Sequence, residues 1–313
     1  MNLLQGKTVL VTGGSGFIGR HLMNRLCQIP DIRIVMLSRK PVIVKTKGVI
    51  QLNTSLEQLS RDVWIKTGIE HFDLIFHLAS FTPKTSSDNN CLPEIYRDNI
   101  VGTRVLLESL PKVPAKIIFS STLDVYSALS EGGVLNELSP TRTVSLYGAS
   151  KLFCEEMICS YAVKQKCCYT ILRYGHIFGP GEDAYGKLIP QTIRKLLNGE
   201  RPVLYGDGSM LRDFLYVDDV VEATLRAATL PYHVLGPVNI VRGKSTTIRN
   251  ITETLIKITG FQGAIKYLEE KTNSYSLCFD NKLMNEMLGV WEFVSLEEGL
   301  KREVEYFKKL CKN

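Results

Sequence analysis

The sequence predicts an α/β fold built on a doubly wound parallel sheet. Short apolar runs alternate with helical patterns along the chain, which is the order that a parallel sheet with crossover helices requires. The first run, Thr8–Val11, is rich in β-branched residues and has no polar face, as expected of a strand buried on both sides. Further strands are expected within Arg33–Ser38, Gly48–Leu52, Phe72–Ser80, Lys116–Tyr126, Tyr169–Tyr174 and Pro237–Ile240.

Length and composition are those of an ordinary globular protein. The 313 residues suffice for one large domain or two moderate ones, and 44% of them are apolar and 22% charged. The net charge of +6 is spread along the chain, which argues against nucleic-acid binding. The eight cysteines form no CxxC pair and none lies near a histidine at metal-ligand spacing, so we expect no metal site. Without a recognisable signal peptide or a run of bilayer length, we expect a cytoplasmic protein with no membrane contact.

Three glycines follow the first strand and precede a helical pattern. Gly13, Gly16 and Gly19 are spaced three apart, and the pattern over His21–Leu26 predicts a helix. Glycines let the backbone turn tightly and approach a pyrophosphate, and the helix N-terminus offers unpaired N–H groups and a positive dipole end. The order of strand, glycine turn and helix therefore predicts a phosphate cradle for a dinucleotide.

The segment Thr12–Gly19 matches the TGGxGFIG signature of the extended short-chain dehydrogenase/reductase family, which it resembles at every fixed position. His77–Ala79 resembles the family's HLA element, and Asn99 begins its NxxGT element. His77 itself stands inside an apolar strand, so we expect a packed core histidine rather than a catalytic one. The resemblance implies a Rossmann fold and a dinucleotide held by Gly13, Ser15, Gly16, Phe17, Ile18, Gly19, Leu78, Ala79, Ser80 and Asn99.

The residue that ends the second strand should meet the adenosine ribose. A carboxylate there would bind the 2′-hydroxyl and favour NAD. The sequence instead has Ser38, followed by the cations Arg39 and Lys40, which could pair with a 2′-phosphate. The sequence therefore favours NADP as cofactor, with NAD as the alternative.

A tyrosine and a lysine in a YxxxK arrangement, Tyr147 and Lys151, open a helix about twenty-five residues after a strand that ends in hydroxyls. Residues four apart share a helix face, so the phenol and the ammonium should face the same space. A nearby cation favours the phenolate of a tyrosine, whose unperturbed pKa is about 10. The pair could therefore serve as acid and base near neutral pH. The resemblance implies that Thr122 completes this set as the catalytic hydroxyl and that Lys151 also binds the nicotinamide ribose.

The residues after Thr122 bear on the reaction. Sugar-nucleotide 4,6-dehydratases usually have Asp-Glu there, whereas this chain has Leu123 and Asp124, so one carboxylate is missing. Decarboxylases stay possible, and Asp124 is expected either to touch substrate or to bond nearby backbone. The resemblance also places two residues at the substrate: Arg212 as a clamp on the diphosphate, and His176 where relatives have Asn, in a substrate contact or a packing role.

Together the motifs resemble NAD(P)-dependent sugar-nucleotide epimerases and dehydratases over essentially the full chain. We expect hydride transfer at C4 of an NDP-sugar, either by a 4-epimerase with NAD or by a 4-keto reductase with NADPH. A dehydratase or decarboxylase is the alternative, and a non-catalytic regulatory or RNA-binding protein on the same fold is a further one. The resemblance implies a homodimer. It also implies a dinucleotide domain over residues 1–175 and about 213–242, and a smaller discontinuous substrate domain over about 176–212 and 243–313.

Overall fold

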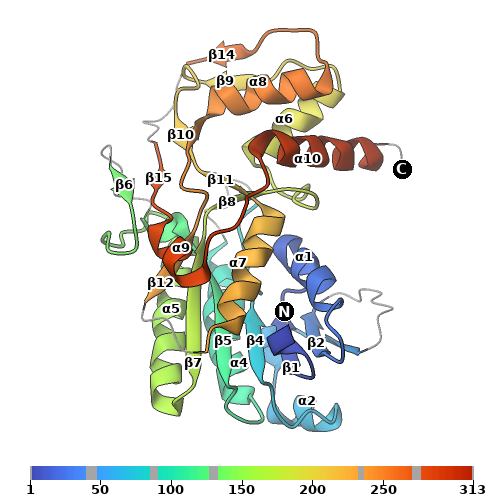
Figure 1. Cartoon of the computed structure of the whole chain (residues 1–313), viewed down its shortest axis with the longest axis vertical. Coiled ribbons are helices and arrows are strands. Elements are labelled where there is room, and N and C mark those ends of the chain that lie inside the picture. The colour runs from blue at the N-terminus through green and yellow to red at the C-terminus, as the bar shows by residue number, and fades with distance from the viewer. Residues whose placement is uncertain are drawn as a thin grey trace.

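The computed structural model describes residues 2–39, 48–84, 91–126, 133–231, 236–269 and 276–311, and Figure 1 shows the whole chain. Within these residues, one parallel sheet of seven strands has the order β12-β7-β5-β4-β1-β2-β3. Its strands are β1 (Thr8–Thr12), β2 (Arg33–Ser38), β3 (Val49–Asn53), β4 (Leu74–His77), β5 (Lys116–Thr122), β7 (Cys168–Tyr174) and β12 (Pro237–Ile240). The predicted doubly wound sheet is confirmed, and its order reverses between β1 and β4.

Successive side chains of each strand pack into separate cores on the two faces of the sheet. Val9 and Val11 belong to one core and Leu10 to the other. Helices α1 (Phe17–Leu26) and α7 (Val217–Thr229) pack on the first face, and α4 (Gly102–Ser109) and α5 (Leu146–Gln165) cover the second. Burial on both faces explains why these strands read as continuous apolar runs in the sequence.

The remaining elements lie mostly beyond the carboxyl ends of the sheet strands. Helices α6 (Leu188–Leu197), α8 (Ile248–Thr259) and α10 (Leu296–Leu310) pack together there, at the top of Figure 1. The other helices are α2 (Arg61–Lys66), α3 (Leu92–Ile95) and α9 (Lys282–Leu288), with short 3₁₀ turns at Asn2–Leu4, Leu56–Gln58 and Leu123–Tyr126. The other strands are β6 (Val134–Leu135), β8 (His176–Phe178), β9 (Val203–Tyr205), β10 (Leu211–Arg212), β11 (Phe214–Tyr216), β13 (Thr246–Thr247), β14 (Lys266–Leu268) and β15 (Cys278–Phe279). No described helix is both long enough and apolar enough to span a bilayer.

One element boundary differs from expectation. The predicted strand Lys116–Tyr126 stops at Thr122, because the Thr122 hydroxyl accepts the Asp124 N–H at 3.2 Å and the chain turns into a 3₁₀ segment. The NxxGT element begins within a π-helical turn, Tyr96–Val101, which contains Asn99. Such turns are frequent at functional sites. The division into two domains stays a prediction.

Candidate active site

A cavity of about 890 Å³ opens at the carboxyl ends of the sheet strands, where the strand order reverses. Ligands of doubly wound sheets bind at this position. The cavity is lined by the glycine turn after β1, the segments after β2, β4 and β5, the start of α5 and the chain from Tyr174 to Ile189. Of the site residues predicted from the sequence, the lining includes Gly13, Ser15, Gly16, Phe17, Ile18, Gly19, Ser38, Arg39, Leu78, Ala79, Ser80, Thr122, Asp124, Tyr147, Lys151, His176 and Arg212.

The glycine turn is built as a close backbone contact. Gly13 has φ +73°, and a Cβ on it would lie 2.7 Å from the Ala79 nitrogen. A Cβ on Gly19 would lie 2.0 Å from the Gly13 carbonyl oxygen. The N-cap residue of α1 is Gly16, which has no side chain to cap the first N–H groups of the helix. The first turn of α1 has no acidic residue. The turn and the helix end therefore fit a pyrophosphate, whose oxygens would accept hydrogen bonds from these N–H groups.

Arg39, which follows β2 and was predicted to favour NADP, forms an ion pair within the protein. Ser38 is buried and donates to the Ser15 hydroxyl at 3.1 Å. Arg39 lines the cavity, but its guanidinium donates to the Asp98 carboxylate at 2.7 Å. Lys40 lies outside the described residues. The Arg39 charge on which the NADP prediction depends is therefore already paired with a carboxylate that lines the same cavity.

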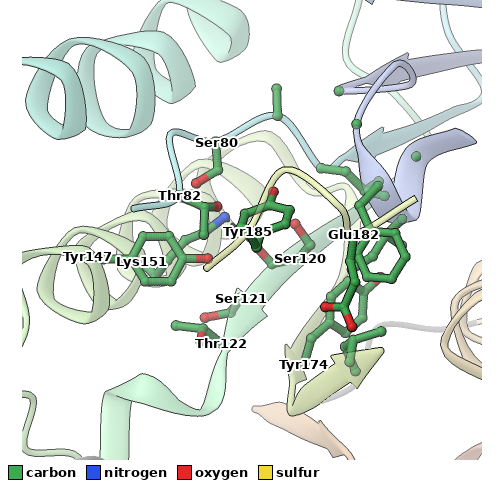
Figure 2. A pocket seen from close by; sticks show the side chains of 18 of the residues that line it. Ser80, Thr82, Ser120, Ser121, Thr122, Tyr147, Lys151, Tyr174, Glu182 and Tyr185 are labelled. Atoms are coloured by element: carbon green, nitrogen blue, oxygen red, sulfur yellow. Dashed lines mark hydrogen bonds between the residues drawn. The ribbon is translucent and has the colours of Figure 1, made fainter. Parts of the chain in front are cut away.

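Tyr147, Lys151 and Thr122 line the cavity, and their polar atoms lie near one another, as Figure 2 shows. Tyr147 and Lys151 come from the first turn and a half of α5, which begins after Ser145 accepts the Gly148 N–H at 2.9 Å. Lys151 Nζ donates to the Ser120 carbonyl at 2.7 Å and lies 6.0 Å from the centre of the Tyr147 ring. The predicted i,i+4 pair thus shares one helix face at the cavity.

The acid–base properties of this pair differ from the expectation. Burial raises the pKa of Tyr147, and the Asp124 carboxylate raises that pKa further, while hydrogen bonds with Thr82 and Ser80 oppose the shift. Burial lowers the pKa of Lys151 to about 8. The lysine therefore does not bring the phenol toward neutral pH by itself, because its ammonium bonds to a backbone carbonyl and both groups are desolvated.

Thr122 is oriented by its backbone neighbour. Its Oγ1 accepts the Asp124 N–H, so its own proton can be donated to a ligand oxygen in the cavity. The two hydroxyls before it bond elsewhere: Ser120 donates to the His77 carbonyl at 3.3 Å, and Ser121 donates to the buried Glu155 carboxylate. Of these three hydroxyl groups, Thr122 is therefore the one whose proton is available to a ligand in the cavity.

Asn99 and His77 support the cavity wall from behind. Asn99 is buried. Its side-chain oxygen accepts the Phe81 N–H at 2.7 Å, and its side-chain amide donates to the Ser150 hydroxyl at 2.9 Å. It is not among the residues that line the cavity, and its side chain bonds to Ser80 and Phe81, so its predicted cofactor contact stays a prediction. The His77 ring bonds to Thr12 and Thr103 at 2.8 and 2.9 Å, which confirms the predicted core histidine.

The substrate candidates Arg212 and His176 also line the cavity. Arg212 is in β10, and His176 is in β8 with its ring 5.8 Å from that of Phe214. Burial, with Arg212 and Lys187 nearby, lowers the pKa of His176 to about 3. Its Nδ1 has no hydrogen-bond partner among the described residues. A neutral imidazole offers one donor and one acceptor, as the Asn of relatives would.

Sequence reasoning missed several lining residues. Lys187 and Glu182 approach each other at 3.5 Å in the segment before α6, and Tyr185 lies between them in the chain. Thr82 hydrogen-bonds with Tyr147. Lys187 is the N-cap of α6, and no local sequence pattern marks it or the other residues as site residues.

A glycine cradle, a helix end and a Tyr–Lys–Thr set around one cavity define a dinucleotide-binding protein with acid–base groups at its site. The chain belongs to the NAD dependent epimerase/dehydratase family, whose model matches residues 9–240. It is 30% identical to a putative UDP-glucose 4-epimerase of Methanocaldococcus jannaschii, over 96% of this chain and 98% of that protein.

Solved structures agree over the whole fold. The UDP-glucose 4-epimerase of Thermotoga maritima with UDP-glucose is 31% identical, with a TM-score of 0.83 over 97% of this chain and 99% of the other. MoeE5, solved with UDP-glucose and NAD, is 28% identical with the same TM-score and coverage. Similar proteins also include a UDP-N-acetyl-alpha-D-glucosaminuronate decarboxylase of Bacillus cytotoxicus, 29% identical over 97% of this chain and 98% of its own length. The family thus covers more than one reaction on this fold.

Proposed function

We propose that this protein is a UDP-sugar 4-epimerase that works with NAD. The observation that carries the proposal is the convergence of Tyr147, Thr122 and Lys151 on one cavity that also contains a dinucleotide cradle. The similarity to 4-epimerases over nearly the full chain supports it. The activity in each relative's name is that of the relative, and we infer the reaction of this chain.

In this proposal, Tyr147 takes the proton of the sugar 4-hydroxyl and later returns it. Thr122 donates its hydroxyl proton to the same sugar oxygen, which holds the reacting carbon near the phenol. Lys151, which bonds to the Ser120 carbonyl, would also hold the nicotinamide ribose. When bound, NAD supplies a hydride acceptor, and its oxidised ring carries a positive charge. That charge would favour the phenolate, which the protein alone disfavours.

The adenosine end supports NAD over NADP. Asp98 and Glu57 line the cavity beside Arg39, and Asp98 pairs with both Arg39 and Arg97 at 2.7 Å. A carboxylate can accept a ribose 2′-hydroxyl but repels a 2′-phosphate. An exchangeable NADPH would suit a reductase, whereas a retained NAD suits an epimerase.

Dehydration has less support in this site. It needs a second acid and base next to the catalytic hydroxyl, and the residue after Thr122 is the apolar Leu123. Asp124 follows, and its pKa is raised by burial, with Lys187 opposing the shift. Decarboxylation of a UDP-uronate would use the same oxidation at C4, so it is the reaction that the assay must separate.

The test is turnover of UDP-glucose, UDP-N-acetylglucosamine and UDP-glucuronate, with analysis of the products and of the dinucleotide released on denaturation. We expect interconversion at C4 with no net oxidation, no CO₂ and released NAD. Tyr147→Phe should reduce turnover by about 10²–10⁴-fold and keep sugar-nucleotide binding. Tyr161→Phe, on the same helix but outside the cavity, is the matched control. No interconversion of any of the three sugars, release of NADP in place of NAD, or CO₂ release would refute the epimerase proposal.

We also propose a homodimer through α3 to α5, as the family resemblance implies. Leu92, Tyr96 and Phe153 on these elements are 54–57% exposed although they are large and apolar. Exposed apolar side chains gathered on adjoining elements are typical of a protein interface. Sedimentation equilibrium would test this, and a monomer at micromolar concentration would refute it.

A further inference from the structure

Two carboxyl groups face each other in the protein interior beside the cavity. Glu182 lies in the cavity wall between β8 and α6 and is 1% exposed, and Glu303 lies in α10 and is 0% exposed. Their side chains are within hydrogen-bonding reach of each other. By hydrogen-bond geometry, neither oxygen of Glu303 has a donor among the described residues, and the cation beside Glu182 is Lys187, whose Nζ is 3.5 Å from Oε2. Two bare carboxylates in such contact would repel, and only a proton held by one of them makes the contact a hydrogen bond.

The surroundings of the pair hold that proton. Burial raises the pKa of Glu182 to about 7 and raises that of Glu303 well above the ordinary carboxyl range. Lys187, whose Nζ is 3.5 Å from Glu182 Oε2, acts against both shifts. Titratable or charged groups near the pair include Tyr185 and Asp183 of the same segment, Tyr306 and Arg302 of α10, Tyr216 at the end of β11 and Arg20 of α1 beside Tyr185.

The pair joins α10 to the segment that carries Lys187 into the cavity. One helical turn after Glu303, Tyr306 donates to the Asp183 carboxylate at 2.8 Å, so α10 contacts this segment at two neighbouring positions. Tyr306 is a neutral donor at physiological pH, and the Glu182–Glu303 contact is the one that depends on a proton. Glu303 itself does not line the cavity.

We propose that Glu182 and Glu303 share one proton, and that Glu303 is a positioning residue that holds the segment 181–187, and with it Lys187, against the cavity. Loss of the proton leaves two buried negative charges in contact and separates α10 from the cavity wall. The effect of the Lys187 position on sugar-nucleotide binding rests on the proposed function, whereas the shared proton does not.

The first test is the melting temperature of the unliganded protein against pH. A carboxyl whose pKa is raised on folding stabilises the protein most at low pH, and that contribution declines as pH rises from its unfolded value of about 4.5 through its folded value. We expect Glu303→Gln to reduce this decline, because the variant loses one of the two titrating carboxyls and its amide donates to Glu182 at every pH. Between about pH 5 and pH 8.5, the wild-type melting temperature should fall by about 2–6 °C more than that of Glu303→Gln. Glu305→Gln, at an exposed position of α10, is the matched control and should follow the wild type.

The second test is affinity for UDP-glucose over the same pH range. Wild-type affinity should weaken with rising pH by about three- to tenfold more than that of Glu303→Gln. If no UDP-glucose binds at any pH, the proposed function fails, and the melting curves still decide the shared proton. Parallel melting curves for wild type and Glu303→Gln would overturn the proposal.

If Glu303→Gln does not fold, Glu182→Gln should give the same flattened pH profile. Infrared spectroscopy near pH 7 detects the shared proton directly, without any pH titration. The C=O stretch of a buried protonated carboxyl should appear in the difference between the spectra of wild type and the double variant Glu182→Gln/Glu303→Gln, which has neither carboxyl. Its absence would show that the pair holds no proton and would also overturn the proposal.

Discussion

Replacement of Gly13 by alanine tests whether the glycine turn is a steric requirement or a local preference. Two costs are expected. Alanine at φ +73° costs about 1–2 kcal/mol because its Cβ crowds the following carbonyl. In addition, the new Cβ would lie 2.7–2.9 Å from three backbone atoms of Leu78 and Ala79. Relief of that overlap must move the exits of β1 and β4 apart and strain the bond from Ala79 N–H to the Thr12 hydroxyl, which measures 3.1 Å.

Gly68 separates the two costs. It follows α2, has φ +66°, and a Cβ on it meets nothing within 4 Å. Gly68→Ala should therefore lose about 1–2 kcal/mol from backbone strain alone. Gly13→Ala should lose about 2–5 kcal/mol, because overpacking of a tight contact adds about 1–3 kcal/mol.

Urea denaturation measures both losses, and titration with NAD measures the effect on the cradle. We expect Gly13→Ala to bind NAD at least about tenfold more weakly, since Ala79 lines the cavity and must move, whereas Gly68→Ala should bind as the wild type does. Equal losses of stability in the two variants, together with unchanged NAD affinity, would refute the steric reasoning.

Two further predictions concern stability. Arg173 and Glu155 form an ion pair at 2.7 Å with side chains that are 5% and 4% exposed, so Arg173→Met should cost about 3–5 kcal/mol by leaving a buried charge. The double variant with Glu155→Gln should recover part of this loss in urea denaturation, and a loss no smaller than that of the single variant would contradict the account. Thr247 caps α8 by accepting the Asn250 N–H at 3.0 Å, and Thr247→Ala should cost about 1 kcal/mol. Thr254→Ala on the same helix should change the urea midpoint little, and equal losses would exclude the cap as the cause.

The sequence predicted what depends on short separations and fixed periods. The cradle follows from glycine spacing next to a strand, and its contacts run between residues three to six apart or between adjoining strand ends. Tyr147 and Lys151 share a face because α5 begins at Leu146 and keeps a regular helical period past both. The core position of His77 follows for the same reason, since the apolar pattern of its strand determines its burial.

What the sequence could not predict depends on pairs of residues far apart in the chain. The sequence predicts that Arg39 could pair with a 2′-phosphate, and only the structure places Asp98, fifty-nine positions later, beside it. The raised pKa of Tyr147 likewise comes from burial and from Asp124, and a spacing rule contains neither. Glu303 reads as an ordinary helix glutamate, because nothing in its neighbourhood shows that its side chain is buried against another carboxyl.

The charges around the cavity support two anionic ligands rather than one. The first anion site is the uncapped start of α1 at the glycine turn, where backbone N–H groups supply the donors. The second is the side with Arg212 and Lys187, whose cations are close enough to lower the pKa of His176. Tyr147 and Lys151 line the same cavity as both sites. A dinucleotide and a second diphosphate would thus meet at the acid–base groups. The pKa of His176, about 3, keeps its imidazole neutral at physiological pH, so it would contact the second ligand by hydrogen bonding rather than by charge.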